Sequence, residues 1–284
     1  MNFNEYIDKL DNKQTLAMLI EIDNNYKNIS LKIPAPKYDK NGKLKNAKEI
    51  KEALKKLKPE LEKVWDNNLD IINKYSKMTL TNNYIIFELL KTKLNMTTGM
   101  ISVEEWNKIQ DKLLTQRQKK IKIQQVMKGN KNHLNKQVQK LVNDMYRDGY
   151  SWVDTQKALE KEFGYNAQRA KRIAITEKWY YKSEAQLQGA KGLDVYKVWI
   201  HSGKAKEPRP HHKEASKKAV VRGIDAKFKI GDYYTVAPQH FGIPSEDINC
   251  RCTMYIELVD DVDLAPKEIQ EAINRYIKEW LYGI

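Results

Sequence analysis

Four of the five histidines and both cysteines of the chain lie between Trp199 and Cys252. Imidazole nitrogens and thiolates bind transition metals, and they also act as bases and nucleophiles in catalysis. The residues that could carry such chemistry are His201, His211, His212, His240, Cys250 and Cys252. We therefore expect any distinctive chemistry of this protein in that stretch.

A zinc site is one interpretation of this stretch, because zinc takes nitrogen and sulfur ligands in a tetrahedral arrangement. The candidate ligands are His212, Cys250, Cys252 and either His211 or His240. A single residue between two cysteines is less diagnostic than a Cys-x-x-Cys pair, and cysteines on one face of a strand also suit a buried core. The expectation is therefore no cofactor, with a structural zinc ion at His212, His240, Cys250 and Cys252 as the alternative.

Nucleophilic catalysis by a cysteine and a histidine is a second interpretation. Nothing in the spacing orders a nucleophile, a base and an oxyanion donor, so no catalytic residue is predicted. The third interpretation is a long loop held by hydrogen bonds from the histidines, Arg209 and Arg251, because loops of this length need internal contacts. The residues alone favour this structural interpretation.

The charge of the chain is unevenly distributed. The net charge is +14, and the segment from Lys108 to Lys140 holds ten lysines or arginines but one acidic residue. Solvated helices usually mix both signs, so this segment predicts contact with a polyanion such as DNA, although a lysine-rich surface without a partner is the alternative. The predicted phosphate contacts are Arg117, Lys119, Lys120, Lys122, Lys128, Lys131, Lys136 and Lys140.

Three features bear on the compartment. The sequence holds no run of about 18 apolar residues, so no transmembrane helix is predicted. Its first residues lack the basic and apolar regions of a secretory signal. Two cysteines separated by one residue cannot readily form an unstrained disulfide with each other. We therefore expect a chain with reduced cysteines, made in a cytoplasm.

Apolar periodicity predicts mostly helices before residue 190 and short strands after it. Pro59, Gly129 and Gly164 are expected to bend or end helices, and Ser102 with Glu105 and Ser151 with Asp154 to begin them. The predicted helices cover residues 1–28 (one or two), 47–75, 82–94, 101–127, 130–145, 151–163, 166–188 and 266–282. The predicted strands cover residues 195–200, 228–230, 233–236 and 252–258. The last helix either packs on the body or docks on a partner.

These elements divide the chain into four segments. Residues 1–46 are predicted to be N-terminal helices with an extended linker, and residues 47–148 a basic helical region. Residues 149–258 are predicted to be a small α+β domain with a few short strands and hairpins. Residues 259–284 are predicted to form an acidic amphipathic helix. The predicted fold class is mainly α, with a helical N-terminal region before the α+β domain.

The run from Tyr146 to Ile256 resembles the head-morphogenesis domain of phage minor head proteins, the MuF-like family. The segment Ala170 to Glu177 resembles its Ala-Arg-Thr-Glu helix, and Asn249-Cys-Arg-Cys252 resembles its most specific motif. Two positions depart from the family pattern. Ile175 stands where the family often has an arginine before Thr-Glu, and the acidic residue usual shortly before Arg209 is absent, with Glu207 the nearest one. The family-motif residues, with an expected structural role, are Thr176, Glu177, Trp199, Arg209, His212, Asn249, Cys250, Arg251 and Cys252.

The resemblance implies a non-enzymatic minor structural protein of a tailed-phage head, located in the virion. Its implied partners are the portal protein, the major capsid protein and double-stranded DNA bound without sequence specificity, and its implied roles are head assembly and DNA delivery. The alternatives are a metal-dependent enzyme, either a nuclease or a relative of ADP-ribosyl-transferring enzymes, and a DNA-binding protein outside the virion.

Overall fold

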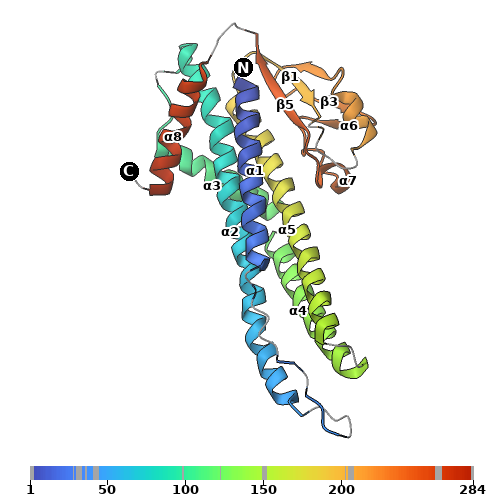
Figure 1. Cartoon of the computed structure of the whole chain (residues 1–284). Helices are drawn as coiled ribbons and strands as arrows, with labels where there is room; N and C mark the ends of the chain where they lie inside the picture. The colour runs from blue at the N-terminus through green and yellow to red at the C-terminus, as the bar shows by residue number, and fades with distance from the viewer. Residues whose placement is uncertain are drawn as a thin grey trace. The chain divides into compact units, whose positions relative to one another are not determined.

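The computed structural model describes residues 3–27, 29, 34–35, 37–40, 45–97, 99–121, 123–148, 152–201, 203, 208–259 and 264–282. Its helices are α1 (Phe3–Lys27), α2 (Ala47–Lys93), α3 (Val103–Lys120), α4 (Ile123–Asp148), α5 (Trp152–Gly189), α6 (Pro210–Ala215), α7 (Pro244–Asp247) and α8 (Pro266–Tyr282). Its strands are β1 (Val195–Ile200), β2 (Val220–Arg222), β3 (Phe228–Ile230), β4 (Tyr233–Thr235) and β5 (Thr253–Leu258). The predicted mainly α fold with a few short strands is confirmed (Figure 1). None of the described helices is long and apolar enough to cross a membrane.

The chain divides into two compact units. The first comprises Met1–Met18, Ile72–Gln116 and Arg172–Ile284, and the second comprises Leu19–Ile71 and Arg117–Lys171. The first unit therefore holds all the strands, α6, α7 and α8, whereas α4 lies wholly in the second. The four segments predicted from composition divide the chain at other positions than these two units, and that division stays a prediction.

The first unit is built around a three-stranded antiparallel sheet in the order β2-β1-β5, with β3 and β4 forming a separate hairpin (Figure 1). In the register of β1 with β5, Trp199 pairs with Met254. Both side chains are fully buried, and the core around them continues to Phe87 of α2 and Ile273 of α8. Gly189, the last residue of α5, contacts the ring of Phe87 so closely that a Cβ would lie 2.7 Å from it. A side chain there would displace this ring.

The apolar face of α8 packs inside the first unit. Ile269 and Ile273 lie in the core of the sheet, and Tyr276 lies in a second cluster with Trp106 and Leu80. The hydroxyl of Tyr276 also donates a hydrogen bond to the backbone carbonyl of Ile101. Of the two outcomes predicted for this helix, the described residues show packing on the body of the protein.

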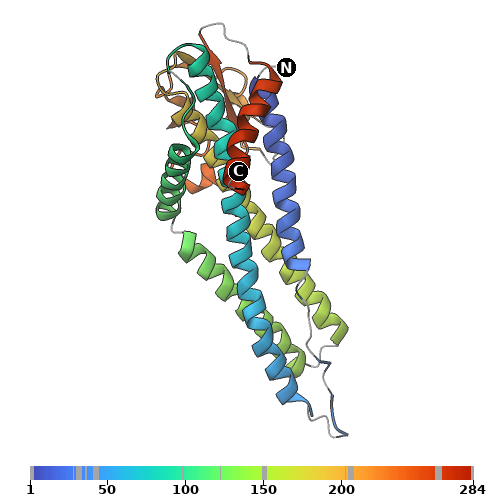
Figure 2. The ribbon, with the colours of Figure 1, turned by 90° about the vertical axis from the view of Figure 1, so that its left-hand side faces the viewer.

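The second unit is a helical assembly made of α4 and parts of α1, α2 and α5. Trp65 of α2 is fully buried and meets the ring of Tyr26 edge-on, with 6.4 Å between ring centroids. Lys131 of α4 forms an ion pair with Asp66 of α2, and α4 crosses α2 at an angle (Figure 2). The other buried apolar side chains of the second unit include Ile22, Leu61, Leu134, Val138, Val142, Leu159 and Phe163. Amphipathic stripes of this kind bury one face of each helix.

Several predicted helix boundaries are wrong. The predicted helices 47–75 and 82–94 form the single helix α2, in which Pro59 is an internal residue. The predicted boundary at Gly164 and Asn166 lies inside α5. The amide of Asn166 donates to the backbone carbonyl of Glu162 instead of capping a helix. Burial on both sides of each breaker outweighs its local cost, which is about 1 kcal/mol for glycine and about 3 kcal/mol for proline.

The predicted helix 101–127 ends earlier than expected. The structure separates α3 from α4 after Lys120, and Gly129 lies within α4. The predicted start at Ser102 is confirmed, because its hydroxyl accepts the backbone N–H of Glu105 at 3.2 Å while the Glu105 carboxylate accepts the N–H of Ser102. The predicted cap at Ser151 and the acidic Glu207 fall outside the described residues.

Candidate functional site

His212 lies in the short helix α6 and is held between aromatic rings. Pro210 occupies the first turn of that helix, a position in which its missing N–H costs no hydrogen bond. The imidazole is 1% exposed, stacks on Phe241 with 5.3 Å between centroids, and meets Trp199 of β1 edge-on at 5.5 Å. This packing fixes the direction in which the two ring nitrogens point.

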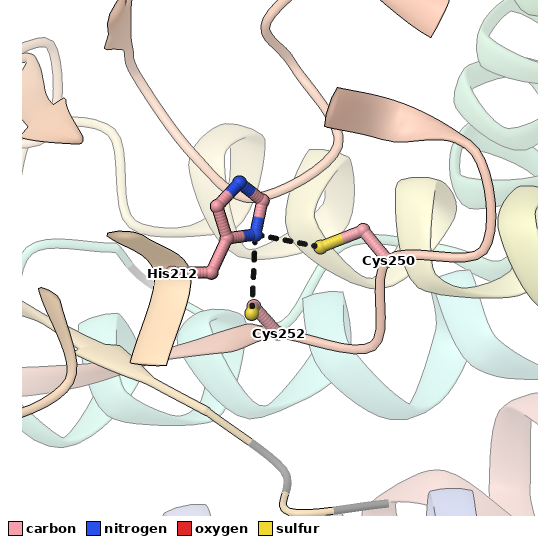
Figure 3. A group of neighbouring side chains, drawn as sticks. All are labelled: His212, Cys250 and Cys252. Carbon is pink, nitrogen blue, oxygen red and sulfur yellow. Dashed lines mark hydrogen bonds between the residues drawn. The ribbon is translucent and has the colours of Figure 1, made fainter. Parts of the chain in front are cut away.

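Both cysteines face one nitrogen of that imidazole. Cys250 Sγ and Cys252 Sγ each lie 3.6 Å from Nδ1 of His212, and both thiols are buried (Figure 3). The cysteines belong to the segment that leads into β5, so strand pairing with β1 positions them beside Trp199. Three residues that are up to 40 positions apart thus form one compact group of nitrogen and sulfur atoms.

Glu246 of α7 occupies the opposite side of the imidazole. Its Oε2 atom lies 3.0 Å from Nε2 of His212 and 2.8 Å from Nε2 of His211. Burial raises the pKa of the Glu246 carboxyl, but hydrogen bonds from both histidines outweigh this effect and leave the pKa below its usual value. The carboxylate therefore stays ionised and accepts an N–H from each ring. The sequence offered no spacing signal for this residue.

The two thiols share one negative charge more readily than they carry two. The hydrogen bond from Cys252 lowers the pKa of Cys250 well below its ordinary value. The same hydrogen bond, together with burial, raises the pKa of Cys252. The two pKa shifts are thus opposite, and Cys250 is the thiol that ionises first.

The backbone around the cysteines is held by the side chains of Gln239, Thr176 and Arg209, of which the sequence had not singled out Gln239. The amide of Gln239 donates to the carbonyls of Cys250 and Cys252, at 3.2 and 2.9 Å. The backbone N–H of Asn249 donates to Thr176 Oγ1 of α5 at 2.9 Å. The predicted hydrogen bonding by Arg209 is confirmed, because its guanidinium donates to the carbonyl of Ile248 at 3.0 Å. The cysteine segment is therefore fixed from several directions.

The remaining family-motif residues lie nearby or in the same fold unit. Glu177 is 5% exposed on α5, and Arg251 lies between the two cysteines. Other candidate histidines have different partners. His240 stacks on Tyr180 and bonds Glu184 at 2.9 Å, and His201 Nδ1 accepts the N–H of Gly203. Of the six His and Cys residues singled out, the structure gathers His212, Cys250 and Cys252, with His211 joined through Glu246.

The predicted phosphate contacts lie mainly on exposed faces of α3 and α4. Lys119, Lys120, Lys128, Lys136 and Lys140 are exposed, and Arg117 is half-buried. Lys131 is also half-buried and pairs with Asp66. Lys122 falls outside the described residues. Five exposed lysines of the predicted set thus extend from the end of α3 along α4.

Two groups of side chains within the described residues have the atoms to hold a metal ion. One is His212, Cys250 and Cys252, and the other is His211, His212 and Glu246. In the second group one carboxylate oxygen already bonds both imidazoles. The first group combines Nδ1 of one imidazole with two sulfurs, the donor set that zinc prefers.

The part of the chain that holds these features also matches a known family. Residues 123–255 match the family described as phage Mu protein F-like proteins. This segment of the chain is thus similar to phage Mu protein F-like proteins. The match begins at α4, earlier than the resemblance predicted from the sequence motifs, because the amphipathic repeat of α4 contains no distinctive motif. The basic helix α4 and the cysteine segment thus both lie within the matched residues.

A curated relative links the chain to a longer protein. The chain is 32% identical over 120 residues to the NAD(+)–arginine ADP-ribosyltransferase EFV of Enterococcus faecalis. The aligned part covers 40% of this chain and 24% of that protein. The chain thus matches about a quarter of the length of this relative. No solved structure is significantly similar to the chain.

Proposed function

We propose that the protein is a non-enzymatic minor structural component of a tailed-phage head. The observation that carries the proposal is the match of residues 123–255 to phage Mu protein F-like proteins. In this proposal the chain is incorporated into the virion after synthesis in the bacterial cytoplasm. It associates with the portal and the major capsid protein, and it contacts packaged DNA during head assembly and delivery.

The proposed DNA contact rests on the charge of the second unit. No acidic residue occurs between Lys112 and Asn143, and five of the lysines predicted there to contact phosphates are exposed on α3 and α4. A lysine that contacts a phosphate releases a counterion, so affinity falls with salt at a slope of about −0.9 per contact. These lysines would bind any DNA sequence, since phosphate contacts carry no base information.

A salt series with a matched control tests this contact. The variant Lys119→Gln, Lys120→Gln, Lys136→Gln removes three exposed charges from the acid-free stretch. The control Lys48→Gln, Lys51→Gln, Lys56→Gln removes three exposed charges from α2, where Glu49 and Glu52 are interspersed. We expect the first variant to lower both affinity for duplex DNA and the salt slope, by up to about 0.9 per lost contact. Equal losses in both variants would contradict a localised DNA surface.

Association with the head is tested on assembled particles. Because α8 packs into the core of the first unit, deleting it would damage the fold and could not isolate a docking role. We therefore expect quantitative mass spectrometry of purified particles to find the chain in few copies, and portal protein to co-purify with it. Absence from particles, with normal expression, would favour the alternative of a DNA-binding protein outside the virion.

The similarity to an NAD(+)–arginine ADP-ribosyltransferase favours a second candidate, ADP-ribosyl transfer. Since the aligned part covers 24% of that protein, the shared segment need not contain its catalytic region. Incubating the purified chain with radiolabelled NAD⁺ and an arginine-rich acceptor separates the two candidates. We expect no labelled acceptor. Labelling that depends on the chain would replace the structural proposal with an enzymatic one.

A further inference from the structure

We propose that His212, Cys250 and Cys252 bind a zinc ion. The proposal goes beyond the function in the phage head and does not depend on it. The ligand atoms are Nδ1 of His212 and the two Sγ atoms, which lie within 4.8 Å of one another. These three atoms supply three of the four ligands of a tetrahedral ion.

The distances fit a tetrahedral zinc ion. Zinc bonds sulfur at about 2.3 Å and imidazole nitrogen at about 2.0–2.1 Å, so tetrahedral angles place the nitrogen about 3.5–3.6 Å from each sulfur. The observed separations of His212 Nδ1 from Cys250 Sγ and from Cys252 Sγ are both 3.6 Å. Figure 3 shows the single nitrogen facing both sulfurs. Both nitrogen–sulfur separations thus already match those around a shared ion.

The tautomer of His212 suits a metal ligand. Nε2 lies 3.0 Å from the carboxylate of Glu246, so the ring proton resides on Nε2 and the lone pair on Nδ1 points to the sulfurs. A carboxylate that accepts the second N–H of a histidine ligand is the usual outer contact of zinc sites, and it orients the ring. His211 bonds the same carboxylate but contributes no atom to the sulfur group.

Charge and burial also favour zinc. His212, Cys250 and Cys252 are 1–3% exposed. Zinc displaces the thiol protons to solvent, and two thiolates then neutralise the divalent ion. The zinc ion with its two thiolates therefore adds no net charge to the buried core. Soft sulfur ligands select zinc over hard cations such as magnesium or calcium.

The ion would fasten α6 to the segment preceding β5. His212 lies on α6, in the long connection between β1 and β2, whereas the cysteines directly precede β5. Described contacts between these parts are hydrogen bonds and ring packing, such as Arg209 to Ile248. A metal bond would add a cross-link whose free energy becomes part of the folding free energy. The proposed role is thus structural.

Metal analysis of the full chain tests the proposal. The protein is purified under reducing conditions without chelator, and its zinc content is measured by inductively coupled plasma mass spectrometry. We expect about one zinc per chain, and X-ray absorption at the zinc edge should show sulfur near 2.3 Å as well as a lighter ligand near 2.0 Å. Chelation should lower the melting temperature, and added zinc should restore it.

Variants distinguish ligands from neighbours. We expect His212→Gln, Cys250→Ser and Cys252→Ser to lose zinc, and Glu246→Gln to bind it about 10- to 100-fold more weakly. The adjacent His211→Gln and the distant His201→Gln should retain full zinc content. If ligand variants do not fold, cobalt added to metal-free wild-type protein still reports sulfur ligands through its thiolate charge-transfer absorption. A reduced wild-type chain that neither contains zinc nor takes it up, or zinc bound without sulfur, would overturn the proposal.

Discussion

The hydroxyl of Thr176 accepts the backbone N–H of Asn249 at 2.9 Å and donates to the carbonyl of Arg172 at 2.8 Å. This contact joins the two sequence motifs that carried the family resemblance, although they are 73 residues apart. Thr176 lies on α5, and Asn249 begins the cysteine segment. The two motifs thus both help to fix the positions of Cys250 and Cys252.

Replacing this hydroxyl should destabilise the protein without emptying much volume. Thr176→Val keeps the shape of the side chain but leaves the Asn249 N–H without its acceptor. Asn249 is exposed and the hydrogen bond is only partly buried, so we expect the free energy of unfolding to fall by the net worth of an ordinary hydrogen bond, about 0.5–1.5 kcal/mol. Urea denaturation followed by circular dichroism measures it. Thr176→Ser, which keeps the hydroxyl, should lie close to wild type, and an equal loss in both variants would argue against the hydrogen bond.

The backbone of Asn249 supplies a second prediction. Its φ angle is +57°, in the left-handed region that costs most non-glycine residues about 1–2 kcal/mol. Asparagine tolerates this conformation, whereas a β-branched residue does not. We expect Asn249→Gly to be nearly neutral and Asn249→Val to lower the urea midpoint clearly. If the order were reversed, the side chain of Asn249, and not its backbone conformation, would explain the requirement.

The sequence predicted β1, β3, β4 and β5, the capping box at Ser102 and the mainly α class, because each depends on local residue patterns, but it missed the three-residue strand β2. It divided α2 and α5 wrongly, since Pro59 and Gly164 are helix breakers only until neighbouring turns are buried. Local patterns do not report burial of this kind. The helices α2 and α5 are therefore longer than predicted.

The candidate site was predictable only in part. Residue type alone singled out His212, Cys250 and Cys252, but it could not separate them from His240, which instead bonds Glu184. Glu246 had no sequence signal, because one carboxylate among 37 acidic residues becomes distinctive only when α7 places it against His212. Tertiary contacts, and not spacing in the sequence, determine which of the candidate residues lie together.

Asp11 of α1 is the centre of a buried ionic cluster and should make stability depend on pH. Its carboxylate pairs with Lys178 at 3.4 Å and Lys182 at 3.2 Å, and the amide of Asn83 donates to it at 3.1 Å. Burial raises the pKa of Asp11, but the attraction of the two lysines and the hydrogen bonds outweigh this, so the net pKa lies below 3.8. The contribution to stability is thus present above pH 3.8 and is lost as the pH falls through the lowered pKa.

Asp11→Asn isolates this contribution. Removing one partner of a buried ion pair costs about 3–5 kcal/mol, because the remaining charge is left uncompensated. We expect a loss of that size at neutral pH, measured by urea denaturation, and a much smaller difference from wild type below the lowered pKa. Asp23→Asn, which disrupts the partly exposed pair with Lys171, serves as the control and should cost less than about 1 kcal/mol. A loss in Asp11→Asn that did not change with pH would show that packing, not charge, is responsible.

Lys197 of β1 holds the loop that follows β2 by its ammonium group. The side chain is fully buried, and its Nζ donates to the carbonyls of Ile224, Ala226 and Val236 at 2.6–2.8 Å. Lys197→Met keeps the length of the side chain but removes every donor. Each carbonyl left without a partner costs about 1–3 kcal/mol, so we expect a total loss of at least about 3 kcal/mol by urea denaturation. Lys229→Met, at an exposed position of β3, should change stability by less than about 0.5 kcal/mol, and a comparable loss there would contradict this role for Lys197.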